Sequence, residues 1–276
     1  MTGPRNGARV APPRGNAPPP AVVLFATRER ARAVARAAFP RRRARLLLAK
    51  SPQELENTFR TSLVDAAIVD LAGAGEETWR AARLAREFPS VPFFGLTTLR
   101  ASESPALAQV AALDFADVLV EAVDDTVLRH LVLRQAFSTR FATALYEPPE
   151  ALELSTPLQQ ATWRCIVGWA GRPVRTQALA DSLRVTREHL SRTFAAEGAP
   201  NLKRVIDLVR LIAAAELAKN PGYDVRDVAE VLDFASSLHL SSTAQRIVGT
   251  KPTSLARLRA VDLVERFTRG HGRSRG

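Results

Sequence analysis

The sequence predicts an α/β domain with a five-stranded parallel sheet, followed by an all-α domain that contains two helix-turn-helix units. Two observations support this prediction. Residues 21–146 alternate short apolar runs with helical stretches, which is typical of a doubly wound parallel sheet covered on both faces. Residues 176–255 contain one helical pattern twice, fifty positions apart. The chain of 276 residues is long enough for about two such domains.

The composition favours a polyanionic partner. The chain carries 39 Lys and Arg residues against 28 Asp and Glu, for a formal net charge of +11. This balance favours nucleic acid, although a solvated, arginine-rich surface gives the same total. The single cysteine, Cys165, excludes an internal disulfide and a zinc knuckle. The early apolar run at 21–26 is too short for a signal-peptide core or a membrane span, so we expect a cytoplasmic protein without membrane contact.

Shifts in composition divide the chain into segments. Residues 1–20 are mostly Pro, Gly, Ala and Arg without apolar periodicity, which is typical of a disordered tail. Pro148 and Pro149 predict a stiff, extended linker. We therefore place the disordered tail at 1–20, the α/β domain at 21–146, the linker at 147–155, the helical domain at 156–262 and a basic C-terminal tail at 263–276.

The α/β domain is expected to alternate strands and helices. Apolar runs predict strands at Ala21–Ala26, Ala44–Ala49, Asp65–Leu71, Val91–Leu96 and Ala116–Val120. Helical stretches are predicted at Arg28–Phe39, Pro52–Ser62, Glu76–Phe88, Ser104–Leu113 and Asp124–Leu145. The last helix would be about 30 Å long, which exceeds what covering one sheet edge needs. It would then pair with a second subunit or lean on the next domain, unless it is an ordinary covering helix that ends earlier.

Over about 125 residues, the order and spacing of these elements resemble a response-regulator receiver domain. Asp70 ends the third strand, where that family keeps the aspartate that accepts a phosphoryl group, and Thr97 stands in the place of its switch hydroxyl. Two positions depart from the family. Ala26-Thr27-Arg28 replaces the acidic pair that helps to hold Mg²⁺, and Glu121 replaces the lysine that neutralises the phosphoryl group.

These departures predict a pseudo-receiver that regulates or dimerises the protein without phosphorylation. The electrostatic stabilisation on which phosphoryl transfer depends is missing. We therefore interpret Asp70 as a solvated carboxylate at the end of a strand. The alternative is that Asp70 accepts a phosphoryl group, as in a phosphorylation-dependent response regulator.

The helical domain repeats one motif at Thr186–Thr193 and Ser236–Thr243. In both copies a hydroxyl residue suited to cap a helix is followed by His-Leu-Ser and, two places later, by Thr. A short helical run precedes each copy, at Thr176–Leu183 and Asp224–Leu232, so each unit is predicted to form a helix, a tight turn and a second helix. Between the units, residues 202–219 are predicted to form one amphipathic helix.

Residues from Leu158 to about Leu258 resemble the DNA-binding domain of AraC-type transcription regulators. The resemblance rests on Gln177–Phe194, Val209–Ala215, Val228–Phe234 and the closing Gly-x-x-Pro at Gly249–Pro252. It implies two reading helices for adjacent major grooves, which lie roughly 34 Å apart on one face of duplex DNA. The family's turn glycine is Arg184 in the first unit and Asp233 in the second. A left-handed backbone there costs a non-glycine residue about 1 kcal/mol.

We expect the exposed face of each reading helix to meet base edges. The predicted base-reading residues are Arg187, Glu188, Ser191 and Arg192 in the first unit, and Ser237, Leu238, Ser241, Ser242, Gln245 and Arg246 in the second. The predicted phosphate contacts are Thr186, Lys203, Arg204, Ser236, Lys251 and Arg257. For His189 and His239 we expect packing or phosphate contact rather than metal binding, and no cofactor is expected.

These features predict a sequence-specific transcription regulator that is not an enzyme. The expected partners are double-stranded DNA, a second copy of the chain, and RNA polymerase or another regulatory protein. Because the second reading helix has no Lys or Arg before Arg246, the main alternative is an interaction adaptor with a decayed DNA-binding domain. Salt-dependent binding to duplex DNA distinguishes these two functions.

Overall fold

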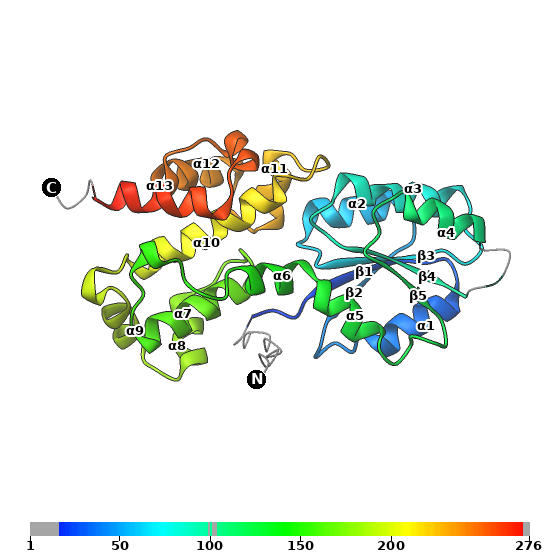
Figure 1. The fold of residues 1–276 in the computed structure, drawn as a ribbon, viewed down its shortest axis with the longest axis horizontal. Coiled ribbons are helices and arrows are strands. Elements are labelled where there is room, and N and C mark those ends of the chain that lie inside the picture. The colour runs from blue at the N-terminus through cyan, green and yellow to red at the C-terminus, as the bar shows by residue number, and fades with distance from the viewer. Residues whose placement is uncertain (1–16, 99, 101–103, 273–276) are drawn as a thin grey trace, which may run out of the picture.

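The computed structural model describes residues 17–98, 100 and 104–272, so most of the tail predicted at 1–20 lies outside the described residues. The α/β domain contains a five-stranded parallel sheet in the order β2-β1-β3-β4-β5 (Figure 1). The strands are β1 (Ala21–Phe25), β2 (Arg45–Ala49), β3 (Ala66–Asp70), β4 (Phe93–Thr97) and β5 (Asp117–Val120). This is the doubly wound order of flavodoxin-like folds, and it confirms the predicted fold class.

Helices cover both faces of this sheet. The helices α2 (Pro52–Thr61), α3 (Glu76–Glu87) and α4 (Ser104–Ala111) lie on one side, and α1 (Glu29–Ala38) and α5 (Leu128–Gln135) lie on the other (Figure 1). Alternate residues of β1 divide between the two faces, since Val23 and Phe25 join the core under α2 and α3 whereas Val22 and Leu24 join the core under α1 and α5. All residues of β1 and β3 are therefore buried.

The prediction of one helix over Asp124–Leu145 is wrong, because the chain bends at Ala136. This residue adopts φ −51° and ψ 141°, so α5 ends before it and α6 (Phe137–Ala144) starts after it. Asp65 holds the new start: its carbonyl accepts a hydrogen bond from Phe137 N at 2.8 Å, and its carboxylate accepts one from Ser138 N at 2.9 Å. Both alternatives are therefore partly right: α5 is a covering helix that ends earlier than predicted, and the separate helix α6 packs against the next domain.

The helical domain contains both predicted helix-turn-helix units. Its elements are the 3₁₀ helix η2 (Glu150–Leu152), α7 (Pro157–Gly168), α8 (Thr176–Leu183), α9 (Arg187–Phe194), the 3₁₀ helix η3 (Ala196–Gly198), α10 (Leu202–Leu217), α11 (Val225–Val231), α12 (Ser237–Val248), the 3₁₀ helix η4 (Pro252–Arg257) and α13 (Ala260–Gly272). The connecting helix α10 crosses between the two units, so it fixes how the second lies relative to the first (Figure 1).

Two segments of this domain differ from the prediction. The expected extended linker at 147–155 includes η2, and its Leu152 and Leu154 are buried in the core. The expected tail at 263–276 is helical as far as Gly272, and Leu263 and Phe267 of α13 are fully buried. Both segments are therefore parts of the folded domain, because their apolar residues find partners that are distant in the sequence.

The two domains dock against each other through charged pairs at the edge of a shared apolar core. Arg172, in the loop after α7, donates from Nη2 to the buried carboxylate of Asp65 at 2.8 Å. Arg60 of α2 donates from Nη1 to Asp227 Oδ2 of α11 at 2.6 Å. Asp227 also completes the capping box of α11, so the first helix of the second unit is tied directly to the α/β domain.

The turn that ends α10 makes further polar contacts between the domains. Ser90 N donates to Asn220 Oδ1 at 2.8 Å, and the Tyr223 hydroxyl donates to the Phe59 carbonyl at 3.1 Å. Gly222 lies so close to the ring of Phe88 that a Cβ there would be 2.6 Å from Phe88 Cζ.

Among the described residues, no helix combines the length and apolar character needed to cross a membrane.

Candidate nucleic-acid interface

The first unit consists of α8, a tight turn and α9. Thr186 caps α9, since its Oγ1 accepts from His189 N at 3.2 Å. Leu190 and Phe194 of α9 are fully buried against the domain. The four residues predicted to read bases lie on the opposite, exposed face: Arg187, Glu188, Ser191 and Arg192.

The second unit consists of α11, a tight turn and α12. Ser236 caps α12, since its Oγ accepts from His239 N at 3.1 Å. Leu238, at the start of α12, is 79% exposed, so its methyl groups are accessible to a partner. Of the other residues predicted to read bases, Ser242, Gln245 and Arg246 are exposed and Ser237 and Ser241 are half-buried.

Both turns adopt the left-handed backbone that favours glycine, although neither has a glycine at this position. Arg184 has φ 56° and Asp233 has φ 55°. Arg210 of α10 supports the second turn, because its Nη2 donates to the carbonyls of Leu232 at 3.0 Å and Asp233 at 3.2 Å. The Arg210 guanidinium also lies 3.8 Å from the ring centroid of Phe234. The sequence did not assign this role to Arg210; the signals were its place in the family-like segment Val209–Ala215 and its charge on the apolar side of an amphipathic helix.

A groove of about 680 Å³ lies between the two units. Its cationic lining residues are Arg175, Arg187, Lys203, Arg210 and Arg246. They come from α9, α10, α12 and the residue before α8, so the groove joins both reading helices in one basic surface. Sequence analysis missed Arg175, whose signal was a basic residue at the N-cap of α8. His239 also lines the groove, and its ring packs edge-on against Phe234, with the ring centroids 5.6 Å apart.

Two predicted arginines are engaged within the protein. Arg246 Nη2 lies 2.9 Å from Asp207 Oδ2 of α10, although its side chain stays 53% exposed. Arg204 lies over the ring of Phe267 in α13, with its guanidinium carbon 5.3 Å from the centroid, and its Nε is buried without a hydrogen-bond partner. The structure therefore does not present Arg204 as a free phosphate contact.

The remaining predicted phosphate contacts keep accessible side chains. Lys203, Lys251 and Arg257 are exposed, and Lys203 lines the basic groove. Thr186 and Ser236 lie at the N-termini of the reading helices, where free N–H groups and the helix dipole attract phosphate. Both hydroxyl oxygens accept a capping hydrogen bond and retain an O–H to donate.

The α/β domain carries a charged cluster at the carboxyl end of its sheet. Arg28 Nη2 lies 2.5 Å from Asp70 Oδ1 and 2.5 Å from Glu121 Oε1. The side chain of Asp70 is 1% exposed, so our interpretation of Asp70 as a solvated carboxylate is wrong. Burial lowers the pKa of Arg28, but hydrogen bonds to both carboxylates outweigh this effect and raise its pKa above the ordinary value. Among the residues that the structure describes, no three His, Cys, Asp or Glu side chains are grouped to hold a metal ion.

Residues 179–257 match the family model of a helix-turn-helix domain. No curated protein matches the chain.

Among solved structures, the chain resembles a response regulator from Thermotoga maritima, with 18% identity over 42% of this chain and 98% of that one and a TM-score of 0.36. It also resembles full-length FixJ from B. japonicum, with 12% identity over 87% and 98% of the two chains and a TM-score of 0.36. RcsB from Salmonella enterica serovar Typhimurium, bound to promoter rprA, has 15% identity over 68% and 97% and a TM-score of 0.34. Residues 179–257 form a helix-turn-helix domain of the AraC type.

Proposed function

We propose that the chain is a sequence-specific transcription regulator whose helices α9 and α12 enter adjacent major grooves on one face of duplex DNA. The observation that carries the proposal is the pair of capped helices with exposed faces, mounted on one connecting helix α10. The basic groove between them supports it, because the phosphate backbone that separates two adjacent major grooves needs neutralising cations there.

The two reading helices would contribute differently. Helix α9 carries Arg187 and Arg192 on its exposed face, and an arginine fork suits the two acceptors of guanine. Helix α12 offers Leu238, serine hydroxyls and Gln245, while the charge of Arg246 is shared with Asp207. Helix α12 therefore supports methyl contacts with thymine and hydroxyl contacts with phosphates, and most discrimination between bases falls to α9.

The test starts from a genome-wide binding experiment, which supplies candidate duplexes. Fluorescence anisotropy with the full chain then measures affinity over a range of salt concentrations. We expect the logarithm of the binding constant to fall linearly with the logarithm of salt concentration, because cations of the groove displace counterions from DNA. If no duplex is bound in a salt-dependent way, the DNA-binding proposal fails.

A second candidate, an interaction adaptor, is favoured by one observation. Leu238 is 79% exposed on α12, whose one Lys or Arg residue, Arg246, is paired with Asp207, and an apolar surface of low charge also fits a contact with another protein. If the chain binds RNA polymerase or another regulatory protein but binds no duplex, that result would support the adaptor. The RNA polymerase contact itself stays a prediction.

We further propose that the α/β domain is a pseudo-receiver that acts without phosphorylation. Arg28 supports this proposal, since its guanidinium pairs with Asp70 and Glu121 at the position where a receiver domain would bind its cation. The two carboxylates thus have a counter-ion within the chain.

The homodimer was expected because the last helix of the α/β domain carries many apolar residues. The structure weakens this argument, because the apolar residues of α6 pack against the helical domain rather than remaining free for a second copy. A single species at the monomer mass in light scattering would exclude the dimer.

A further inference from the structure

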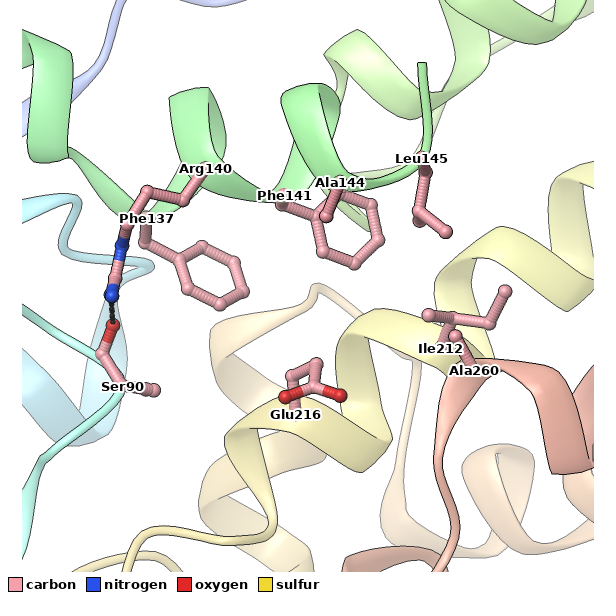
Figure 2. A pocket seen from close by; sticks show the side chains of 9 residues that line it. All are labelled: Ser90, Phe137, Arg140, Phe141, Ala144, Leu145, Ile212, Glu216 and Ala260. Atoms are coloured by element: carbon pink, nitrogen blue, oxygen red, sulfur yellow. Dashed lines mark hydrogen bonds between the residues drawn. The ribbon is translucent and has the colours of Figure 1, made fainter. Parts of the chain in front are cut away.

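A pocket of about 260 Å³ lies on the seam between the two domains, at a distance from both the reading helices and the Arg28 cluster. Figure 2 shows its walls: Phe137 and Phe141 project from α6, and Ile212 and Glu216 face them from α10. Ser90, from the segment before β4, closes one end. Because both domains contribute walls, the complete pocket exists only when they are docked.

The lining of the pocket is mainly apolar. The rings of Phe137 and Phe141 lie 5.9 Å apart between centroids and are inclined by 31°. A dry cavity of about 150 Å³ holds benzene. The pocket of about 260 Å³ is larger, so an aromatic ring with a short substituent fits within it.

The charges at the pocket select the sign of that substituent. Glu216 already has a counter-ion, since Lys219 Nζ lies 2.6 Å from its Oε1. Arg140 at the rim donates to the Ser90 carbonyl at 2.6 Å (Figure 2). Among the described residues, Arg140 has no carboxylate partner. Burial lowers the pKa of Arg140, as expected for a cation whose charge nothing nearby compensates. The uncompensated charge of the pocket is therefore positive, and it lies beside an apolar cavity.

We propose that this pocket binds a small apolar monocarboxylate, with its hydrophobic body between α6 and α10 and its carboxylate on Arg140. Guanidinium and carboxylate groups match in shape, and charge-assisted hydrogen bonds of this kind are stronger than neutral ones. The ligand touches both domains, so it stabilises their docked arrangement by mass action.

The test uses isothermal titration calorimetry on the full chain with 3-phenylpropionate as the probe. We expect saturable one-to-one binding. Two related probes separate charge from size: 3-phenylpropylamine has the same body with the opposite charge, and acetate has the charge without the body. Neither is expected to bind in the concentration range where 3-phenylpropionate saturates. Equal binding of the amine, or no binding of 3-phenylpropionate at millimolar concentration, would overturn the proposal.

Two variants test the site, and a third is the matched control. Arg140→Gln removes the charge and is expected to weaken binding by about tenfold or more. Ala144→Phe fills the pocket mouth from an exposed position of α6 and is expected to abolish binding. Arg134→Gln removes an exposed arginine of α5 outside the pocket and should leave the affinity unchanged. If Arg140→Gln and Arg134→Gln bind the probe equally, Arg140 does not hold the carboxylate and the proposal is rejected.

A regulatory consequence rests on the proposed function, whereas the binding itself does not. The pocket borders α10, which carries both reading helices. If bound carboxylate changes the affinity for a duplex by some factor, the duplex must change the affinity for the carboxylate by the same factor. Calorimetry without DNA tests the pocket, and anisotropy without the carboxylate tests DNA binding, so failure of one is distinguishable from failure of the other.

Discussion

At the carboxyl end of the sheet, one guanidinium stands between two carboxylates. The side chains of Asp70 and Glu121 are 1% and 8% exposed, so each would carry an unfavourable buried charge without Arg28. The side chain of Arg28 is 29% exposed, so the cluster of three charges keeps some contact with water through Arg28. A phosphoryl group or a metal ion that approached Asp70 would have to displace Arg28 first.

Acetyl phosphate with Mg²⁺ is therefore expected to leave the intact mass of the protein unchanged, because Arg28 covers Asp70 and Glu121 repels a phosphoryl group. Intact-mass spectrometry measures the outcome directly. A gain of one phosphoryl group in the wild-type chain that disappears in Asp70→Ala would show that the domain is a working receiver. Asp117→Ala, at an exposed carboxylate of β5, is the control for non-specific modification.

Arg192→Ala is expected to weaken binding to a cognate duplex by about 1–3 kcal/mol and to relax the preference at one base pair. The reason is the loss of a forked donor from the exposed face of α9. Arg83→Ala, which removes an exposed arginine from α3 in the other domain, is the matched control for net charge. Equal losses in the two variants would mean that Arg192 contributes only long-range charge.

At the scale of elements, local patterns in the sequence predicted most strands and helices to within a few residues. Apolar runs and capping residues such as Thr156 and Ser236 act within one turn of chain, so they can be recognised without a partner. The bend between α5 and α6 could not be predicted in this way, because Asp65, the residue before β3, holds it from about 70 positions away in the sequence. The prediction missed helix α13, although Leu263, Val264 and Phe267 recur at helical spacing, because the sequence after Phe267 is rich in Arg and Gly and resembles a tail.

Glycine at the two tight turns should stabilise the units unequally. A left-handed backbone costs a non-glycine residue about 1–2 kcal/mol. Glycine avoids this cost but loses more conformational entropy on folding, which costs about 0.5–1 kcal/mol. Arg184→Gly is therefore expected to raise the free energy of unfolding by about 0.5–1 kcal/mol. Asp233→Gly should gain less, because aspartate tolerates this region and Arg210 already binds the turn carbonyl. Urea unfolding compares the midpoints, and a larger gain for Asp233→Gly would contradict this account.

At the scale of the whole molecule, the candidate site was only partly predictable. The exposed residues of α9 and α12 follow from helical periodicity alone, so sequence analysis could name them. The pairing of Arg246 with Asp207 and the stacking of Arg204 on Phe267 depend on how α10 meets α12 and α13. The contacts between the domains are further removed, since Ser90 and Asn220 are separated by 130 positions. No periodicity in the sequence reports such pairs.

Loss of one interdomain ion pair should destabilise the protein strongly. Arg172→Gln leaves Asp65, whose side chain is 0% exposed, without its counter-ion. Removing one partner of a buried pair costs about 3–5 kcal/mol, and we expect the lower end because two backbone N–H groups still donate to Asp65. Arg269→Gln is the control, since its exposed pair with Glu265 should contribute less than about 1 kcal/mol. Urea unfolding of both variants measures the difference; equal midpoints would contradict the proposed role of Asp65.

The same Asp65 has a consequence for biosynthesis. Its carboxylate also accepts from Ala21 N at the start of β1, so Asp65, just before β3, joins two strands that are made early. Its counter-ion, Arg172, follows 107 residues later. At a synthesis rate of about 5–20 residues per second, that distance corresponds to about 5–20 s. During that interval the nascent chain carries Asp65 without the counter-ion that it has in the folded protein, so we expect the sheet to reach its final stability only after the loop beyond α7 leaves the ribosome.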